Sequence, residues 1–412
     1  MQLKTVLTER YKRVTFWTAF SLLLLYTVIV WNVLVWLILP DNEGIQKDDD
    51  RAASHKRQHA ANPRYRARSL LDVWNASVTS MPCTPKEHVL FIKVPKCGSS
   101  TLSSIILRYG FRHSLKTALP LGSKFNLVSL LRSLNDSDHQ RDKHDIFASH
   151  VRYKVVKDHE HLVPNDAFYV TIIREPLSAF KSFFNYRHKG AYFGLEGKNQ
   201  LEMFFSNSSL YTSPEAARFW NRMIRYLGFK VPANTTQSTP HAVEEARQYV
   251  YHIDREFDFV IVLEYFEECL ILLKRMLCWG THEFFYTQQK TGSSFSEDYN
   301  SAVKEVDDPT VVKRYRELSY ADYILYDYFK LRIEKVLENQ NTDFFNEVRN
   351  FKAVNRKVAE FCQSNATFGE TLEMPPSKWT SGFIMRKEYC RLLTFGVKKY
   401  IKFLEKKKFH VV

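Results

Sequence analysis

A short apolar run, His88-Val-Leu-Phe-Ile-Lys93, is followed by the turn Val94-Pro-Lys-Cys-Gly98 and by Ser99-Ser-Thr-Leu-Ser-Ser-Ile-Ile-Leu-Arg-Tyr109. In the last part, apolar residues recur at the three- and four-residue spacing of one helical face. Ser99 or Ser100 can cap the N-terminus of such a helix, and Gly110 suits the position just past its end. The stretch therefore predicts a strand, a tight loop and a helix in immediate succession.

Two later segments repeat this order of an apolar run, a turn and a helical pattern. The first is Ala167-Phe-Tyr-Val-Thr-Ile-Ile173, followed by Arg174-Glu-Pro176, in which the proline suits the first turn of the next helix. The other is Phe257-Asp-Phe-Val-Ile-Val-Leu263, with a helical pattern over residues 267–278. Apolar runs that alternate with helices predict an α/β fold with a central parallel sheet flanked by helices.

Polar residues follow the first two strands at their carboxyl ends, where parallel sheets bind ligands. After the first strand, Lys96, Gly98 and a run of hydroxyl residues offer a phosphate or sulfate a cation, backbone N–H groups and a positive dipole end. After the second, Arg174 and Ser182 can share a further phosphate, with a salt bridge from Arg174 to Glu175 as the structural alternative. The pattern G-x-x-x-x-G-K-[ST] is missing from the sequence, which argues against an NTPase.

The composition is that of a folded protein. The chain has 412 residues, of which 45% are hydrophobic, and 59 Lys and Arg against 45 Asp and Glu give a net charge of +14. These values exclude a disordered or collagen-like chain and allow either several domains or one large α/β domain. The charge alone does not distinguish nucleic acid, a membrane surface or a small anion as the partner. The sequence contains no C-x-x-C or H-E-x-x-H spacing, so it predicts no metal site.

An uncharged apolar segment covers residues 14–40 and is long enough to cross a bilayer core of about 30 Å. A cleaved signal peptide, the alternative, would have an apolar region of only about 7–15 residues. Basic residues precede the segment and acidic residues follow it, so the positive-inside rule places the N-terminus in the cytosol. We therefore expect a cytosolic tail (1–13), a transmembrane signal-anchor (14–40), a stem (41–86) and a lumenal domain (87–412).

Two features agree with a lumenal, glycosylated body. The six cysteines are an even number, as expected in an oxidising compartment. Cys362 and Cys390 are the first candidates for a bridge because they close one modest loop; the alternative is two small buried hydrophobic residues. Triplets that can accept an N-linked glycan begin at Asn75, Asn135, Asn207, Asn234 and Asn365.

The two polar motifs resemble those of a known enzyme superfamily. Val94-Pro-Lys-Cys-Gly-Ser-Ser-Thr101 resembles the 5′-phosphosulfate loop of sulfotransferases, and Arg174-x-Pro-x-x-x-x-x-Ser182 resembles their 3′-phosphate motif. The longer stretches 91–102, 171–186 and 257–266 are similar to the Golgi galactose 3-O-sulfotransferase family, which includes galactosylceramide sulfotransferase. The resemblance implies a P-loop-like sulfotransferase domain behind one transmembrane helix, a type II protein of the Golgi membrane. It also implies a carbohydrate sulfotransferase that uses 3′-phosphoadenosine 5′-phosphosulfate (PAPS) as co-substrate.

The resemblance further implies roles for individual residues. Lys96 would neutralise the bridging oxygen as adenosine 3′,5′-bisphosphate leaves, and Arg174 with Ser182 would hold the 3′-phosphate. His150 resembles the functional His of a family segment H-x-R-[FY], so we expect it to be the general base; a structural His is the alternative. Cys97 is either an activated thiol or a small packing residue. The loop residues expected to contact the donor are Lys93, Lys96, Cys97, Gly98, Ser99, Ser100 and Thr101.

The acceptor leaves alternatives open. The galactose 3-O branch usually reads K-T-H-K in the donor loop, whereas this chain reads Lys93-Val94-Pro95-Lys96, which is more like the uronyl 2-O-sulfotransferases of glycosaminoglycans. We expect transfer to the 3-OH of galactose on a glycolipid or glycoprotein. A glycosaminoglycan uronate and a non-catalytic carbohydrate-binding module are the alternatives. The expected partners are the glycan and the membrane; a homodimer stays open, and a lumenal domain argues against nucleic acid.

Overall fold

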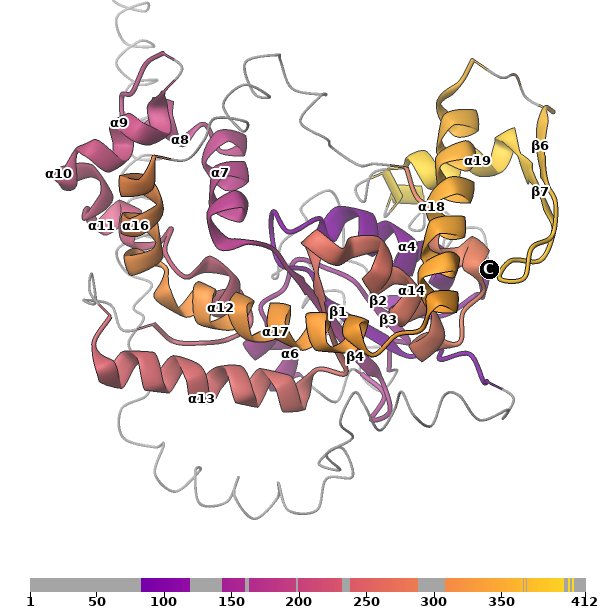
Figure 1. Cartoon of the computed structure of the whole chain (residues 1–412), viewed down its shortest axis with the longest axis horizontal. Helices are drawn as coiled ribbons and strands as arrows, with labels where there is room; N and C mark the ends of the chain where they lie inside the picture. Colours follow the sequence, from indigo (N-terminus) through magenta and orange to yellow (C-terminus); the bar gives the residue numbers. More distant parts are fainter. Residues whose placement is uncertain are drawn as a thin grey trace, which may run out of the picture. The chain divides into compact units, whose positions relative to one another are not determined.

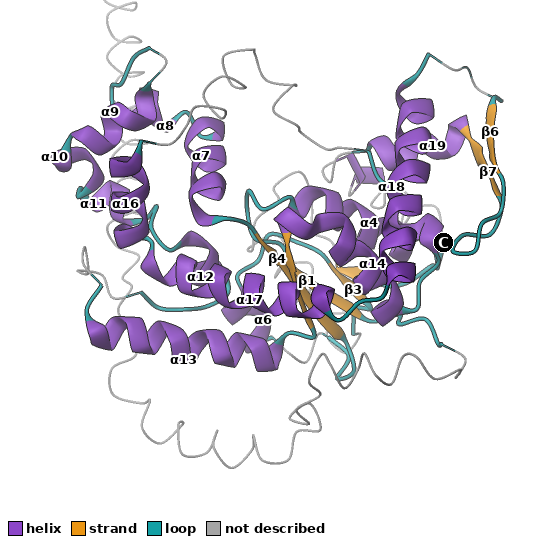
Figure 2. Ribbon diagram, viewed as in Figure 1, coloured by secondary structure: helices purple, strands orange, loops and turns teal. Residues whose placement is uncertain are grey.

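A five-stranded parallel sheet in the order β2-β3-β1-β4-β5 forms the centre of the fold (Figures 1 and 2). Three of its strands are those predicted from the apolar runs, and the other two have two residues each, too short for a periodic signal. The strands are β1 (Val89–Ile92), β2 (Thr117–Ala118), β3 (Ile146–Phe147), β4 (Phe168–Ile173) and β5 (Phe259–Val262). The computed structural model describes residues 83–118, 143–159, 163–197, 199–231, 238–287, 308–365, 367, 369–395, 399–400 and 402–403.

The strand order places the loops after β1 and β4 at one point. Every residue of β1, β4 and β5 is buried, as expected for a parallel sheet with helices on its faces. Val89 of β1 lies opposite Phe168 of β4 in the register. The chain leaves β1 toward β2 and leaves β4 toward β5, on opposite sides, so the order reverses between β1 and β4. Open α/β sheets bind ligands beyond the carboxyl ends at such a reversal.

A helix follows each predicted strand: α4 (Ser99–Arg112), α7 (Pro176–Tyr186) and α14 (Phe266–Leu277). Two expectations about α4 were wrong. Its N-cap is Gly98, and Ser99 and Ser100 already belong to the helix, so neither caps it. Gly110 lies inside the helix rather than past its end; a Cβ there would lie 2.8 Å from Cγ1 of Ile146. The glycine therefore permits close packing of α4 on the sheet.

The other helices extend the domain on both sides of the sheet (Figure 1). α17 contacts β5, α7, α12 and α13, whereas α18 contacts α14 and α19, and a two-stranded antiparallel hairpin, β6–β7, contacts α18 and α19. Aromatic side chains of α7, α9 and α16 form a second hydrophobic cluster beside the sheet core. The bounds are α6 (Tyr153–Asp158), α8 (Lys189–Tyr192), α9 (Gln200–Ser206), α10 (Ser208–Tyr211), α11 (Pro214–Ala217), α12 (Arg222–Tyr226), α13 (Pro240–Glu256), η3 (Leu263–Tyr265), η4 (Thr281–Phe284), α16 (Pro309–Leu318), α17 (Tyr320–Glu338), α18 (Thr342–Gln363), β6 (Thr371–Met374), β7 (Phe383–Arg386) and α19 (Lys387–Thr394).

Two disulfides join elements of this domain. Cys362 at the end of α18 pairs with Cys390 of α19, which confirms the expected bridge. Cys83 pairs with Cys278, a pairing the sequence did not indicate. The N-glycosylation triplets at Asn207 and Asn365 begin on exposed residues.

The expected cytosolic tail, the signal-anchor (14–40) and the stem up to residue 82 lie outside the described residues. The triplets that begin at Asn75, Asn135 and Asn234 also lie there. In the part of the chain that the structure describes, helices are either too short or too polar to span a bilayer. The expected domain boundaries therefore stay predictions.

Candidate functional site

The loop between β1 and α4 is held in a tight turn by its backbone. Lys96 and Gly98 both adopt the left-handed conformation, with φ of 69° and 72°. A Cβ on Gly98 would lie 2.5 Å from Cδ1 of Leu263, so the loop passes directly against the residue that follows β5. No described side chain caps α4, which leaves amide N–H groups of its first turn for an anion.

Two lysines of this loop have different surroundings. Lys93 is buried, with 2% of its surface exposed, and its ammonium donates to the hydroxyl of Ser100 at 3.3 Å. The ammonium of Lys96 lies 3.9 Å from the centroid of the Tyr186 ring, at the C-terminal end of α7. The predicted donor loop therefore carries one lysine directed into the loop and a second one directed toward α7.

Arg174, directly after β4, connects the second motif to the first. Its guanidinium Nη1 donates to the carbonyl oxygen of Lys96 at 3.5 Å. Among the described residues Arg174 forms no ion pair with Glu175, because that carboxylate instead accepts from the backbone amides of Leu177 and Ser178, at 3.0 and 2.6 Å, and caps α7. The structural alternative for Arg174, a salt bridge to Glu175, is therefore absent from the described residues.

One face of α7 is turned toward the donor loop. Ser178, Ser182 and Tyr186 recur every four residues, which places them in a row on the helix. Tyr186 contacts Lys96, so this row faces the loop. The structure thus brings Lys96, Arg174 and the helix face with Ser182 to the same edge of the sheet. The roles expected for them at this edge stay predictions.

His150 lies just after β3, beside β1 in the sheet. Its side chain is exposed, and Nδ1 lies 3.0 Å from the carbonyl oxygen of Lys93. If Nδ1 carries the proton and donates to this carbonyl, Nε2 is the acceptor nitrogen of the neutral ring. The arrangement is compatible with a general base, and equally with a residue that holds the loop.

Cys97 is a packing residue. Its side chain is fully buried, and its Sγ–H donates to the carbonyl oxygen of Pro95 at 3.6 Å. Burial raises the pKa of the Cys97 thiol far above its usual range, although the nearby Arg174 guanidinium opposes the shift. The activated-thiol interpretation is therefore wrong.

The sequence reasoning missed two contributors to this edge. Glu264, after β5, accepts from the backbone amide of Glu175 at 2.9 Å and so ties the third strand to the second. Tyr186 ends the family-like stretch 171–186, but no contact with Lys96 was predicted for it. Its four-residue spacing from Ser182 was the available signal, since residues so spaced share a helix face.

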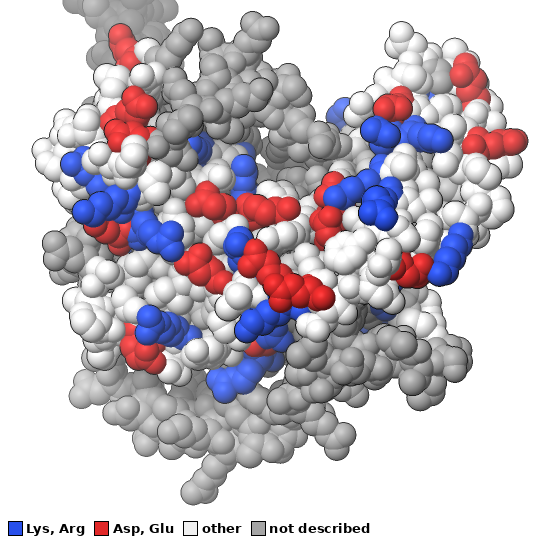
Figure 3. Space-filling model, in the orientation of Figure 1, with Lys and Arg blue, Asp and Glu red and all other residues white. Residues whose placement is uncertain are grey.

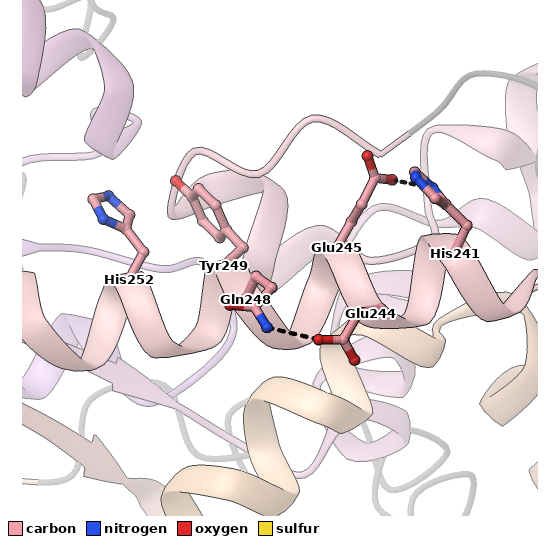
Figure 4. A pocket seen from close by; sticks show the side chains of 6 residues that line it. All are labelled: His241, Glu244, Glu245, Gln248, Tyr249 and His252. Atoms are coloured by element: carbon pink, nitrogen blue, oxygen red, sulfur yellow. Dashed lines mark hydrogen bonds and ion pairs between the residues drawn. The ribbon is translucent and has the colours of Figure 1, made fainter. Parts of the chain in front are cut away.

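A shallow pocket lies elsewhere, on one side of α13 (Figure 4). Its polar side chains pair with one another: His241 with Glu245 at 3.4 Å and Gln248 with Glu244 at 2.6 Å. None of its lining residues comes from the loops after β1 or β4, so it is separate from the candidate site. In the described ranges there is also no group of three or more His, Cys, Asp or Glu side chains placed to hold a metal ion.

The fold and this edge define an α/β protein with a strand–loop–helix turn after β1 and an arginine before the start of α7, both at one reversal of the parallel sheet. A family model described as galactose-3-O-sulfotransferase matches residues 9–371. The chain therefore belongs to the galactose-3-O-sulfotransferase family, as its motifs predicted.

Curated relatives agree with the family. The galactosylceramide sulfotransferase of Homo sapiens is 26% identical over 273 residues, which cover 64% of this chain and 60% of the relative. The galactose-3-O-sulfotransferase 4 of Bos taurus is 24% identical over 310 residues, 60% of this chain and 64% of the relative. The galactose-3-O-sulfotransferase 3 of Mus musculus is 29% identical over 233 residues, 52% of each chain. The chain thus spans about half to two thirds of the length of these relatives.

Proposed function

We propose that this chain is a carbohydrate sulfotransferase that transfers the sulfuryl group of PAPS to the 3-OH of galactose on a glycolipid or glycoprotein. The observation that carries the proposal is the meeting of the two motifs: Arg174 after β4 donates to the carbonyl of Lys96 in the loop after β1. Membership of the galactose-3-O-sulfotransferase family supports the same reaction.

The residues at this edge suit the donor. The amide groups at the start of α4 and the hydroxyls of Ser99, Ser100 and Thr101 would hold the 5′-phosphosulfate, with Lys93 already bonded to Ser100. Arg174 and Ser182 would hold the 3′-phosphate, since the Glu175 carboxylate accepts from the backbone amides of α7 and forms no ion pair with the Arg174 guanidinium within the described residues. Lys93, Lys96, Arg174 and the N-terminus of α4 thus place several positive charges at one edge of the sheet. This suits a donor that carries several negative charges.

The chemistry requires an in-line path, neutralisation of the leaving group and a base. In the proposed step, the S–O bond to the 5′-phosphate breaks and a new S–O bond forms to the galactose oxygen. Lys96 would neutralise the charge that develops on the released phosphate oxygen. His150 Nε2 would take the proton of the acceptor hydroxyl, because Nδ1 is occupied by the Lys93 carbonyl in the required tautomer.

The cellular setting is part of the proposal. An apolar segment at 14–40 with a basic flank before it supports a single-pass type II protein of the Golgi membrane with its catalytic domain in the lumen. The exposed triplets at Asn207 and Asn365 and two disulfides suit an oxidising compartment.

One observation favours a second candidate, 2-O-sulfation of a uronate in a glycosaminoglycan. The donor loop reads Lys93-Val94-Pro95-Lys96 and lacks the His that the galactose 3-O branch carries there. A base would then have to come from another element, and His150 fills that role in either candidate.

The test is incubation of the purified full chain in detergent with sulfur-labelled PAPS and a panel of glycans, followed by linkage analysis of the product. The panel contains galactosylceramide, N-acetyllactosamine and a uronate-containing oligosaccharide. The inactive control is Lys96→Ala, which we expect to lose at least about a hundredfold in turnover, the scale of losing one charge-stabilising group.

Each outcome decides between the candidates. Sulfate at C3 of galactose supports the proposed reaction, whereas sulfate at C2 of a uronate supports the second candidate. A complete lack of transfer, with folded protein, would support a non-catalytic carbohydrate-binding module. Transfer by Lys96→Ala at near the unmodified rate would overturn the role of Lys96.

A further inference from the structure

Three cations gather beyond the C-terminal end of α7. Arg187 follows α7, Lys189 begins α8, and Arg222 begins α12. His188 between the first two adopts a left-handed conformation with φ of 49°, which turns the chain so that α8 packs back against α7. Among the described residues, none of the three cations forms an ion pair with a carboxylate.

Aromatic rings take the place of acidic partners. The guanidinium carbon of Arg222 lies 3.6 Å from the centroid of the Phe183 ring. The ammonium of Lys189 lies 4.1 Å from the centroid of the Tyr192 ring. The guanidinium carbon of Arg187 lies 5.9 Å from the centroid of the Tyr186 ring. Rings attract cations but do not neutralise them. The cluster therefore keeps a local excess of positive charge.

The three charges act on one another. Burial lowers the pKa of Lys189, and the neighbouring Arg187 and Arg222 lower it further. Burial also lowers the pKa of Arg222, and Arg187 adds to this shift, while Tyr315 and Asp322 oppose it. The buried carboxylate of Asp322 lies at the start of α12 and accepts from the backbone amides of Met223 and Ile224 at 3.1 and 2.8 Å, but it forms no ion pair with the Arg222 guanidinium within the described residues.

This arrangement differs from ordinary charged surface. On the face shown in Figure 3, Lys and Arg are interspersed with Asp and Glu over most of the described surface. Some exposed cations elsewhere pair with carboxylates, as Arg316 does with Asp327 at 2.9 Å. A group of cations held on rings without such partners is suited to an external anion.

The cluster borders the proposed donor site at the C-terminal end of α7. Tyr186 is the contact of Lys96, and Arg187 follows it directly in the chain. Arg222 is near enough to Cys97 of the donor loop to influence its thiol. Tyr186 and Tyr192 are 39% and 59% exposed, and an exposed ring is a surface on which a sugar can stack.

We propose that Arg187, Lys189 and Arg222 form a subsite for a carboxylate or sulfate group carried by the acceptor glycan, next to the sugar that receives the new sulfate. The inference rests on the proposed function. The acceptor is thus an acidic glycan rather than a neutral one, with the exposed rings of Tyr186 and Tyr192 against its sugar faces. Donor phosphates are the other possible source of an oxyanion, but the loop after β1, Arg174 and Ser182 already suit them.

The test compares matched acceptors with the full chain. N-acetyllactosamine and its 6-sulfated form, which carries the extra sulfate on the N-acetylglucosamine, differ only by one anion. We expect the sulfated acceptor to have at least a tenfold higher kcat/KM. In the double variant Arg187→Gln/Lys189→Gln this preference should fall to less than threefold, while the Kd for adenosine 3′,5′-bisphosphate changes by less than twofold.

A matched control removes two exposed cations from α18, which Figure 1 shows well away from α7 and α8. The variant Arg356→Gln/Lys357→Gln should keep the preference for the sulfated acceptor. An unmodified chain without any preference, or an Arg187→Gln/Lys189→Gln variant that keeps it, would overturn the proposal. If the Arg187→Gln/Lys189→Gln variant instead bound adenosine 3′,5′-bisphosphate tenfold more weakly, the cluster would belong to the donor-binding site.

Failure of the proposed function gives a separate result. If the chain transfers sulfate to neither acceptor, calorimetric binding of the 6-sulfated disaccharide still reports on the subsite. Binding at least tenfold tighter than that of N-acetyllactosamine, lost in Arg187→Gln/Lys189→Gln, would support the subsite in a non-catalytic protein. Equal affinities for the two disaccharides would contradict the proposed subsite.

Discussion

The ammonium of Lys96 lies over the ring of Tyr186, 3.9 Å from the ring centroid. The two residues come from separate motifs, one in the loop after β1 and the other at the end of α7. In a partly exposed site such a contact is worth about 0.5–1 kcal/mol. The ring therefore restrains the ammonium beside the C-terminal end of α7.

The first prediction concerns this restraint. Tyr186→Leu should lower kcat about two- to fivefold, the equivalent of 0.5–1 kcal/mol, because Lys96 loses its fixed position. Tyr186→Phe keeps the ring and should retain most of the rate. Steady-state kinetics with varied PAPS measures both variants. A faster Tyr186→Leu enzyme would show instead that the ring holds Lys96 away from its working position.

The second prediction separates two roles of His150. If its Nε2 is the base, both His150→Ala and His150→Asn should lose about 10²–10⁴-fold in turnover, the range for general base catalysis. Asn can still donate a hydrogen bond toward the Lys93 carbonyl, which lies 3.0 Å from Nδ1. Binding of adenosine 3′,5′-bisphosphate serves as the control for loop geometry. Recovery of turnover in His150→Asn would assign the residue a positioning role.

The sequence was sufficient for those parts of the fold that depend on local pattern. The apolar runs before Lys93, Arg174 and Glu264 are buried strands of one parallel sheet. They were predictable because each run is short, rich in β-branched and aromatic residues, and followed by a turn and a helical pattern. Cys362 and Cys390 were also recognisable, since only 28 residues separate them.

Contacts between distant segments were not predictable in this way. Cys83 and Cys278 are 195 residues apart, and no local feature selects one among the possible partners. Gly110 carries the usual mark of a helix end, yet the packing of Ile146 against it overrides that mark. The contact of Lys96 with Tyr186 depends on how α7 lies against the donor loop, which only the folded sheet determines.

The third prediction concerns Gly98. Its left-handed φ should cost an alanine about 1 kcal/mol, and the overlap of the new Cβ with Leu263 should add about 1–3 kcal/mol. Gly194 is a matched control, because it has a φ of 69° and a Cβ added to it would meet nothing within 4 Å. Urea unfolding of the full chain should therefore show a larger loss for Gly98→Ala than for Gly194→Ala. Equal losses would mean that the contact with Leu263 is relieved at little cost.

The last prediction concerns Glu283 of η4, a buried carboxylate beside the end of α4. Its Oε1 pairs with Arg112 at 2.8 Å and with His113 and His282 at 3.2 Å each. Burial alone would raise the pKa of Glu283, but the hydrogen bond from His282 and the charge of Arg112 outweigh it, so the pKa lies below the usual 4.5. A carboxyl with a lowered pKa in the folded state stabilises the protein above about pH 4.5 and loses this contribution as the pH falls through the folded-state pKa.

Glu283→Gln should thus lower the free energy of unfolding by about 3 kcal/mol at pH 7, the scale of breaking a buried ion pair. Urea unfolding between pH 3.5 and 8 should show the gap between the two proteins narrowing at the acid end, while the exposed Glu360→Gln stays within about 0.5 kcal/mol throughout. A gap that keeps its size down to pH 3.5 would show that the charge of Glu283 is not what stabilises the fold.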